Sequence, residues 1–342
     1  MTISLVVPVY NAECTLGVLL HSILAQTRGF DQLIFVDNGS TDRSVTLLES
    51  FAAAHPELDV MVLREDRRNP GVARNRAIDH VRGEVVGFTD ADCQLDPRWA
   101  EMAVAAFQSD LQLGILGGVE TPVRRDPLIA RYSAFVTATS RRPPAIVRSK
   151  SEWFDGNLVS TLNMAVRRQV LERLQGFVRW RAGEDMDFWM RALDLDISVR
   201  VHEPRLIVHH EPRVRLASYL ARQWDYALAV PILLAHHFRG SMHVTTSRRL
   251  LVRCPMVTSL VELNPHTALV PLLVLFGWKS LAVYALFLAV KPIRFLIDSR
   301  RAAEPVTLAD AIRMTAVFEL FRWVVGAASL VGSVRHRVLC VR

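Results

Sequence analysis

The stretch GEVVGFTDADCQLDPRW, Gly83–Trp99, decides the fold that we expect for this chain. Its first part, Val85–Phe88, is a short apolar run typical of a buried strand, and it ends abruptly in Thr89–Asp92. Two carboxylates therefore follow the carboxyl end of a strand, where open α/β sheets bind their ligands. Such oxygen ligands suit a divalent cation that also holds a diphosphate. A solvated acidic turn gives the same pattern, so other motifs must decide.

The composition limits the class of protein. A chain of 342 residues can hold two domains, or one large domain with an appendage. Hydrophobic residues make up 51% of it and the mean hydropathy is +0.20, which is high for a globular enzyme. The net charge is +7, and much of the basic excess lies beside apolar stretches of the second half. This distribution favours a membrane surface as a partner over nucleic acid.

The cysteines and the N-terminus indicate a cytoplasmic catalytic part. The four cysteines are scattered without metal-type spacing, as expected for reduced thiols; they are Cys14, Cys93, Cys254 and Cys340. The first residues, MTISLVVPVYNAE, lack a basic segment before their apolar run. We therefore expect them to form a first strand rather than a signal peptide.

The first hundred residues alternate between strand and helix patterns. Strands are expected over Ile3–Val9, Gln32–Val36 and Val60–Leu63, and helices over Cys14–Gln26 and Ser44–Ala54. A Pro-Gly break then opens an Arg-rich helix that leads into the Asp90 strand. This alternation predicts an α/β fold with a mostly parallel, doubly wound, Rossmann-like sheet.

Polar residues follow the ends of these strands and would converge on one crevice. Asp37 could accept hydrogen bonds from a base or a ribose, and Arg74 at a helix start could meet a phosphate. Tyr10, Asn11, Asn38 and Asp90 lie at comparable positions. A plain Asx turn also explains Asp37 and Asn38. Because neither GxGxxG nor GxxxxGK[ST] occurs, dinucleotide and P-loop sites lose their main support.

Four motifs in order resemble the nucleotide-binding half of the family 2 glycosyltransferases, which have the GT-A fold. They are SLVVPVYNAE from Ser4, VDNGSTD from Val36, NPGVARNRAI from Asn69 and FTDADCQLDP from Phe88. The resemblance covers about residues 1–240. It implies a nucleoside pocket, a ribose contact at Asp90, and Asp92 on a Mg²⁺ or Mn²⁺ ion. The residues implied for the nucleoside pocket are Pro8, Tyr10, Asn11, Asp37 and Asn69.

A second acidic motif, GEDMDFWMRALD, spans Gly183–Asp194. Acids in the first turn of a helix also complement its macrodipole, so the motif alone is ambiguous. Together with Asp92, it resembles the catalytic Glu-Asp pair of the family. The resemblance makes Asp185 the catalytic base, with Glu184 beside it. It also relates Asn163, in a strand-like piece that a helix over Arg168–Leu174 follows, to a similar Asn-containing strand, and we assign Asn163 to donor binding.

Two adjacent histidines follow the strand-like run Arg205–Val208. A histidine at a strand end is most often a structural residue, but some GT-A enzymes place a second metal ligand here. Because neighbouring strand residues point to opposite faces, only one of the two faces the crevice. We favour His209 over His210, since it follows the apolar run directly, and the sequence leaves both open.

The C-terminal third has a different composition. Ala268–Val290 is almost continuously apolar, with Gly277 and Lys279 near its centre, and basic residues such as Lys291 and Arg294 follow. A single span, a re-entrant hairpin, or a buried helical subdomain or dimer interface fits this pattern. The apolar run Ala316–Val334 contains Glu319 and Arg322, which favours an interfacial position. We expect residues 241–342 to be a hydrophobic helical tail at the cytoplasmic face of the membrane, beside a catalytic domain over 1–240.

These features predict a metal-dependent, inverting glycosyltransferase. It would move one sugar from a UDP- or GDP-sugar to a saccharide, lipid or lipid-linked acceptor, in the synthesis of envelope polysaccharide, glycolipid or lipid-linked glycan. Processive synthases of the family carry Gln-x-x-Arg-Trp, and here only RQW occurs, from Arg222, which favours single addition. The alternatives are a membrane-anchored nucleotide-sugar binder without catalysis, and a nucleotidyltransferase. The latter typically needs a basic Gly-rich loop, which is absent near the first strand.

Overall fold

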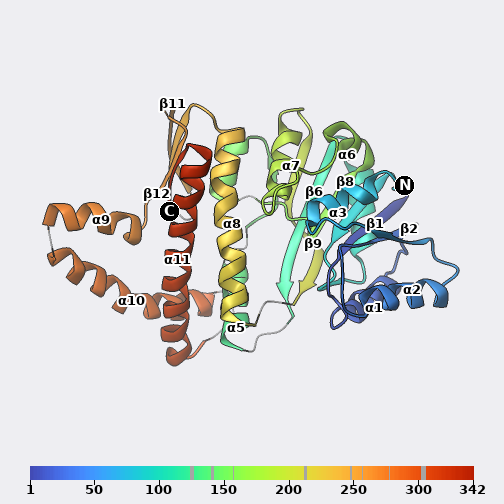
Figure 1. Ribbon diagram of the computed structural model, residues 1–342, viewed down its shortest axis with the longest axis horizontal. Coiled ribbons are helices and arrows are strands. Elements are labelled where there is room, and N and C mark those ends of the chain that lie inside the picture. The colour runs from blue at the N-terminus through green and yellow to red at the C-terminus, as the bar shows by residue number, and fades with distance from the viewer. Residues whose placement is uncertain are drawn as a thin grey trace. The chain divides into compact units, whose positions relative to one another are not determined.

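The computed structural model describes residues 1–123, 127–139, 142–156, 158–211, 214–246, 249–255, 257–276, 278–301 and 306–342. The chain divides into two compact units, whose elements are labelled in Figure 1. The first unit contains residues 1–123, 142–150 and 157–211, and the second contains 124–141, 151–156 and 212–342. Residue 240, where we expected the change of domain, falls within the second unit.

The first unit begins with a parallel α/β half. Its strands are β1 (Ile3–Val9), β2 (Gln32–Asp37), β3 (Val60–Arg64) and β4 (Val85–Thr89), and its helices are α1 (Leu16–Leu24), α2 (Ser44–Ala54) and α3 (Pro70–Ile78). The strands lie in the order β3-β2-β1-β4, and all their pairs are parallel. Strands β2 and β4 are buried along their whole length, as their near-continuous apolar sequences require. The expected Rossmann-like start is confirmed.

The sheet continues through strands of mixed direction. The remaining elements are β5 (Cys93–Leu95), α4 (Trp99–Ser109), β6 (Leu113–Pro122), β7 (Ala145–Val147), β8 (Asn163–Arg167), α6 (Arg168–Leu174), α7 (Glu184–Leu193) and β9 (Ser198–His210). The short helix η1 (Lys150–Asp155) belongs, except for Lys150, to the second unit. Strand β8 pairs antiparallel with both β4 and β6, whereas β6 and β9 are parallel. The result is a nine-stranded sheet of the α/β class.

Two segments of this half differ from the expected pattern. We expected two short strands around residues 198–208, but β9 is continuous because a residue with positive φ, His202, accommodates an irregularity in its pairing. The basic segment Ser140–Ser151 reads as a mobile loop from its prolines. Residues 140 and 141 lie outside the described residues, and the rest contains β7, which pairs with β9.

Buried contacts of Trp99 in the core of the first unit support the strand that leads into the Asp90 turn. Trp99, at the start of α4, is fully buried, and its indole lies against Gly87 in β4. A Cβ atom at Gly87 would lie 2.7 Å from the Trp99 ring, so this strand position requires glycine. The ring nitrogen of Trp99 also donates a hydrogen bond to Asn163 Oδ1 at 2.8 Å in β8. These contacts hold β4 and β8 in register beneath the acidic turn.

The second unit combines helices with a small sheet. Its elements are α5 (Leu128–Thr139), α8 (Leu216–His237), β10 (Ser241–Thr246), β11 (Arg249–Pro255), β12 (Ser259–Glu262), α9 (Pro265–Phe276), α10 (Lys279–Arg301), α11 (Leu308–His336) and β13 (Leu339–Val341). The sheet has the order β11-β10-β12-β13. Helices α8 and α11 run side by side, as Figure 1 shows. Within this unit, Arg322 of α11 and Arg342 at the end of the chain both bind the buried carboxylate of Glu262 in β12.

The apolar run Ala268–Val290 is divided between α9 and α10, and Gly277, expected at its centre, lies outside the described residues. Two helical segments, Lys279–Arg300 and Leu308–His336, are long and apolar enough to cross a membrane by length and composition. Many apolar side chains at the α9–α10 turn are exposed, including Val274 at 81% and Trp278 at 76%. Helices α10 and α11 are therefore candidate membrane-associated segments, as the sequence predicted.

Candidate functional site

Three parallel strands deliver polar residues to one edge of the first unit's sheet. Strand β1 ends at Val9, beside Asp37 of β2, and β4 ends at Thr89 before the acidic turn. The Asp37 carboxylate is buried, and its Oδ1 accepts a hydrogen bond from Ser40 N at 3.0 Å. Carboxyl ends of parallel strands meet at the same edge, so the convergence expected from the sequence is present.

The loop after β1 is held to the loop after β2. Asn11 has a left-handed backbone, with φ of 46°, and its Oδ1 accepts a hydrogen bond from Thr41 N at 2.8 Å. Tyr10 beside it is 47% exposed, and the Arg68 guanidinium lies 5.0 Å from its ring centroid. Pro8, partly buried, pairs with Val36 in the strand register. The loop thus presents one aromatic ring to solvent on a fixed backbone.

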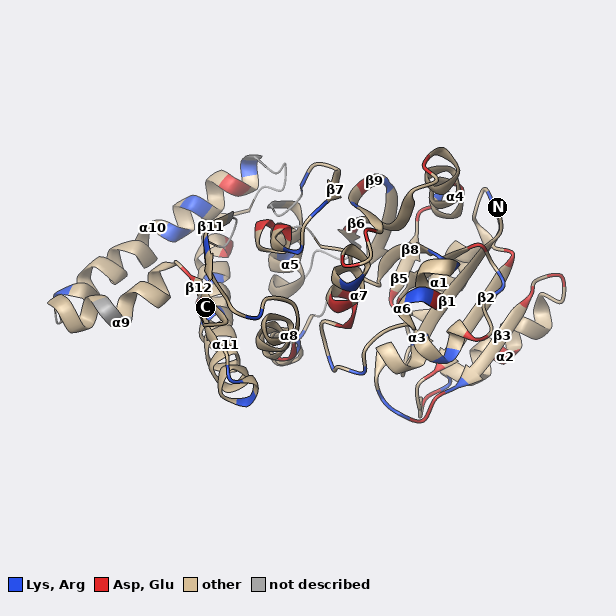
Figure 2. Cartoon of the chain, turned by 90° about the horizontal axis from the view of Figure 1, so that it is seen from above, with Lys and Arg blue, Asp and Glu red and all other residues tan. Residues whose placement is uncertain are grey.

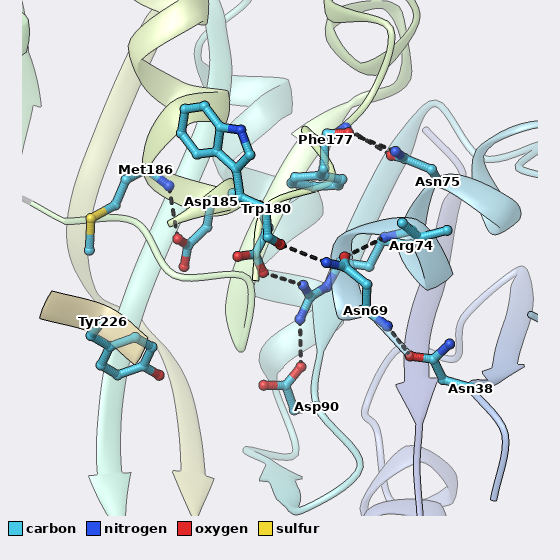
Figure 3. Close-up of polar contacts among 12 residues, drawn as sticks. Asn38, Asn69, Arg74, Asn75, Asp90, Phe177, Trp180, Asp185, Met186 and Tyr226 are labelled. Carbon is cyan, nitrogen blue, oxygen red and sulfur yellow. Dashed lines mark hydrogen bonds and ion pairs between the residues drawn. The ribbon is translucent and has the colours of Figure 1, made fainter. Parts of the chain in front are cut away.

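Asn69 serves a structural role in the loop that precedes α3. Its Oδ1 accepts from Val72 N at 3.0 Å and caps the helix, and its Nδ2 donates to the carbonyl of Trp180 at 2.7 Å. Its backbone N–H donates to Asn38 Oδ1 at 2.9 Å (Figure 3). The nucleoside contact expected of this side chain therefore competes with two hydrogen bonds that order the loop.

Arg74 of α3 lies between the two acidic motifs. Its Nη2 is 2.7 Å from Asp90 Oδ1 (Figure 3). Its Nη1 is 3.0 Å from Glu184 Oε1. The side chain is only 2% exposed. We expected Arg74 to meet a phosphate, but its guanidinium pairs with carboxylates instead, because burial requires each charge to have a partner. This ion pair brings the start of α7 to the acidic turn after β4.

The acids at the start of α7 have unusual electrostatics. Burial, followed by the charge of the adjacent Asp185, raises the pKa of Glu184 to about 7. Burial also raises the pKa of Asp185, although Arg74 and the backbone N–H groups of Met186 and Thr161 oppose the shift. The Met186 N–H donates to Asp185 Oδ1 at 2.8 Å. A partly buried carboxylate with a raised pKa is suited to accept a proton.

Asp92 meets a histidine from β9. His210 Nε2 lies 3.3 Å from Asp92 Oδ2, and His210 Nδ1 lies 2.9 Å from Glu120 Oε1 at the end of β6. Burial lowers the pKa of His210, but hydrogen bonds to these two carboxylates outweigh it and raise the pKa to about 10. Asp92 is 42% exposed, so the pair is open on one side.

Of the two histidines, it is His210, and not the His209 that we favoured from the sequence, that lies next to Asp92. Strand β5 pairs antiparallel with β9, so that Cys93 lies opposite His210 and Gln94 opposite His209. This register places His210 next to Asp92. The apolar run before His209 could not show which of the two histidines faces Asp92. That depends on how β9 pairs with β5, a strand of only three residues.

Asn163 is placed differently from our expectation. Its Nδ2 donates to the carbonyls of Val119 and Leu206 at 2.9 Å each, and its Oδ1 accepts from Trp99. The side chain is 4% exposed. All of its polar atoms are engaged inside the sheet, so it positions strands rather than a ligand.

Glu120 is the site residue that our sequence analysis missed. A polar residue that ends an otherwise apolar run, ILGGVE, was the available signal. Within the described residues, no group of three or more His, Cys, Asp or Glu side chains is arranged to hold a metal ion. The arrangement around Asp92 therefore consists of one carboxylate and one imidazole, with Glu120 orienting the imidazole.

Comparison with known proteins begins with the sequence. The family described as "Glycosyl transferase family 2" matches residues 4–175, half of the chain. Glycosyltransferase AglE of Haloferax volcanii is 26% identical over 202 residues, which cover 58% of this chain and 63% of AglE. Poly(ribitol-phosphate) beta-glucosyltransferase of Bacillus spizizenii is 34% identical over 125 residues, 35% of this chain and 20% of that enzyme. The chain thus spans less than two thirds of the length of either relative.

Solved structures show the same fold. The mannosyltransferase PcManGT from Pyrobaculum calidifontis, in complex with GDP-Man and Mn²⁺, superposes with a TM-score of 0.61 and 20% identity. The match covers 93% of this chain and 86% of that one. S. aureus TarS gives a TM-score of 0.51 at 20% identity, covering 69% of this chain and 40% of TarS. At this identity the likeness concerns the fold alone.

Proposed function

Because the chain belongs to glycosyl transferase family 2, we propose that it transfers one sugar from a UDP- or GDP-sugar to an acceptor hydroxyl with inversion. The observation that carries this proposal is the pairing of Arg74 with both Asp90 and Glu184. It supports a single site in which the acidic turn faces the donor and the start of α7 faces the acceptor. Asp37, Tyr10 and Asn11 then border the nucleoside.

A divalent cation, Mg²⁺ or Mn²⁺, fits the Asp92 end of this site. The carboxylate of Asp92 and the imidazole of His210 are ligands that such ions accept, and the hydrogen bond that His210 Nδ1–H donates to the Glu120 carboxylate is the usual support of a ligating histidine. The cation would neutralise negative charge on the departing nucleotide diphosphate. The complex of PcManGT with GDP-Man and Mn²⁺ is consistent with this assignment.

Asp185 acts as the general base in this proposal. Its carboxylate takes the proton of the acceptor hydroxyl while that oxygen bonds to the anomeric carbon. The bond from the anomeric carbon to the phosphate oxygen breaks on the opposite face, and the nucleotide diphosphate leaves with the electron pair. A single displacement inverts the anomeric configuration and needs no covalent glycosyl-enzyme. Arg74 fixes the neighbouring Glu184, and burial raises the pKa of Asp185, which makes its carboxylate a stronger base.

The tail determines where the reaction takes place in this proposal. We assign catalysis to residues 1–240 and membrane association to residues 241–342, at the cytoplasmic face of the cell membrane. The exposed apolar side chains at the α9–α10 turn support this assignment. The acceptor is then a saccharide, lipid or lipid-linked glycan of the cell envelope. The name of the Bacillus spizizenii relative, a poly(ribitol-phosphate) beta-glucosyltransferase, is in keeping with a glycan-synthesis acceptor.

The Asp185→Asn substitution tests the proposal. Donor binding is measured as the rise in Tm on addition of UDP- or GDP-sugars with Mn²⁺, and turnover as release of nucleoside diphosphate with a glycan acceptor. We expect the variant to keep the rise in Tm and to lose about 100-fold or more in turnover. Asp194→Asn, at the other end of α7 and 53% exposed, is the matched control and should keep both.

Two outcomes would contradict the proposal. Turnover retained in Asp185→Asn would assign the base to another residue. The wild-type protein would instead be a nucleotide-sugar binder if it binds a donor but neither transfers sugar to any glycan acceptor tested nor hydrolyses the donor.

A further inference from the structure

Whereas the candidate active site belongs to the first unit, an apolar groove lies between α10 and α11 in the second unit. Its volume is about 560 Å³, within the range of small-molecule sites. Its lining includes Leu288, Ile293, Leu308, Ile312 and Ala316, with Glu319 the one charged residue. It therefore offers an extended hydrocarbon surface with a carboxylate in its wall.

The carboxylate in the wall does not present an unpaired charge. Glu319 forms an ion pair with Lys291 and accepts a hydrogen bond from Tyr284 Oη at 3.0 Å. The Lys291 ammonium also lies over the Phe318 ring, 3.4 Å from its centroid. Because these groups compensate one another, the groove keeps an apolar character at its charged end.

The groove opens onto an exposed apolar surface. Ile293, Leu308 and Ile312 are 54%, 57% and 54% exposed. They belong to the two helical segments that are apolar enough to cross a membrane, and only 17% of the more apolar segment is buried within the protein. Exposed aliphatic side chains that line a hollow favour an occupant made of hydrocarbon.

Basic residues lie next to the lining residues on both helices. Arg294 follows Ile293 and is 68% exposed, and Arg313 follows Ile312 and is also exposed. Successive helical residues are about 100° apart, so these guanidinium groups flank the groove rather than fill it. Figure 2 shows basic residues along α10. Cationic groups beside an apolar surface are complementary to the anionic headgroups of a membrane lipid.

We propose that the α10–α11 groove binds one hydrocarbon chain of an anionic membrane lipid, with Arg294 and Arg313 next to its headgroup. The proposal concerns a discrete lipid site, which goes beyond adsorption of the tail to a membrane. It depends on the second unit alone and does not require sugar transfer.

Photocrosslinking tests this site in the full-length protein. The probe is a phosphatidylglycerol with a diazirine in one acyl chain, added at 1 part to about 20 in vesicles of phosphatidylcholine and phosphatidylglycerol. Cross-linked residues are mapped by mass spectrometry. We expect the cross-links to concentrate on the groove, between Leu288 and Glu319. Ala316→Trp, which fills the groove from an exposed position, should reduce them about 5-fold or more while the protein still sediments with vesicles.

A matched substitution controls for bulk on the same helix. Ala327→Trp also adds an indole at an exposed position of α11, but Ala327 does not line the groove, so cross-linking should stay at the wild-type level. Ile312→Gln provides a second groove variant that adds polarity rather than bulk, and it should also reduce cross-linking. Circular dichroism confirms that each variant folds.

Several results would overturn the proposal. Cross-links spread evenly over α9, α10 and α11, and unchanged in both groove variants, would mean adsorption without a site. Equal labelling in vesicles of phosphatidylcholine alone would remove the headgroup contact. A wild-type dimer that becomes a monomer only in Ala316→Trp, by light scattering, would show that a second copy occupies the groove.

Discussion

Arg74 and Glu184 form a buried ion pair, with 3.0 Å between Nη1 and Oε1, across 110 residues of sequence. The other terminal nitrogen of Arg74 binds Asp90, so one guanidinium connects two acidic motifs. Without it, three carboxylates, those of Asp90, Glu184 and Asp185, would share a poorly solvated region. The geometry of the candidate site therefore depends on a cation that belongs to the protein itself.

Replacing Arg74 tests this dependence. Arg74→Met keeps much of the side-chain volume but leaves Glu184 buried without its partner. The free energy of unfolding should fall by about 3 to 5 kcal/mol, the usual cost of removing one member of a buried pair. Urea denaturation at pH 7 measures this change. Arg98→Met is the control, because Arg98 pairs with Glu101 on the surface, where solvent screens the charges and the pair contributes little to stability. Equal losses in the two variants would contradict a central role for Arg74.

Much of the site could be predicted from the sequence, because its position depends on strand ends. Asp37 and the acidic turn Asp90–Asp92 follow apolar runs typical of buried parallel strands. The alternation of strand and helix patterns predicted that these strands end at the same edge of the sheet. The roles of long or amide side chains could not be predicted in the same way. Arg74 can reach several directions from the start of α3, and its partner Glu184 comes from a distant segment whose packing no local pattern encodes.

The second half of the chain shows a similar limit. Its composition predicted apolar helices, and the run Ala268–Val290 contained the residues at which α9 and α10 separate. Helix α8 continues through Pro231 to His237, although an interior proline usually ends a helix. Here the ring of Pro231 lies against Gly332 of α11, where an added Cβ would come within 2.8 Å of it. Close packing between these two helices accounts for the uninterrupted helix.

Glu184 should make the stability of the protein depend on pH. Its pKa is about 7 in the folded protein, compared with about 4.5 when it is unperturbed. Between these values the unfolded chain has lost the proton that the folded protein keeps, so stability falls as pH rises. The slope attributable to Glu184 is at most about 1.4 kcal/mol per pH unit, and it disappears above the folded pKa.

Comparison with Glu184→Gln isolates this effect. The free energy of unfolding of the wild type minus that of the variant should decrease from pH 4.5 to pH 7 and then level off. Glu172→Gln, at a surface position 57% exposed, is the matched control for replacing a glutamate by glutamine. A difference between wild type and Glu184→Gln that is constant over this range would show that Glu184 ionises normally.

The two histidines provide a matched test of the proposed metal site. His210 contacts Asp92, whereas His209 lies opposite Gln94. In the presence of a nucleotide-sugar donor, Mn²⁺ should raise the Tm of the wild type and of His209→Ala, since a ligand that binds only the folded protein stabilises it. His210→Ala and Asp92→Asn should lose most of this increment. An increment lost in His209→Ala and kept in His210→Ala would reverse the assignment, and turnover that persists in EDTA would exclude a need for the ion.

Asn163 supplies the last prediction, because its contacts give it a role in the sheet rather than in donor binding. Asn163→Ala removes the partner of three buried groups, namely the carbonyls of Val119 and Leu206 and the indole N–H of Trp99. Each unsatisfied group costs about 1 to 3 kcal/mol, so the free energy of unfolding should fall by at least about 3 kcal/mol. Trp99→Phe, which removes only one of these hydrogen bonds and part of an indole, should cost less. At a temperature at which Asn163→Ala remains folded, the donor KM should match that of the wild type. A stable variant with a tenfold higher donor KM would instead return Asn163 to the donor site, as its sequence context had predicted.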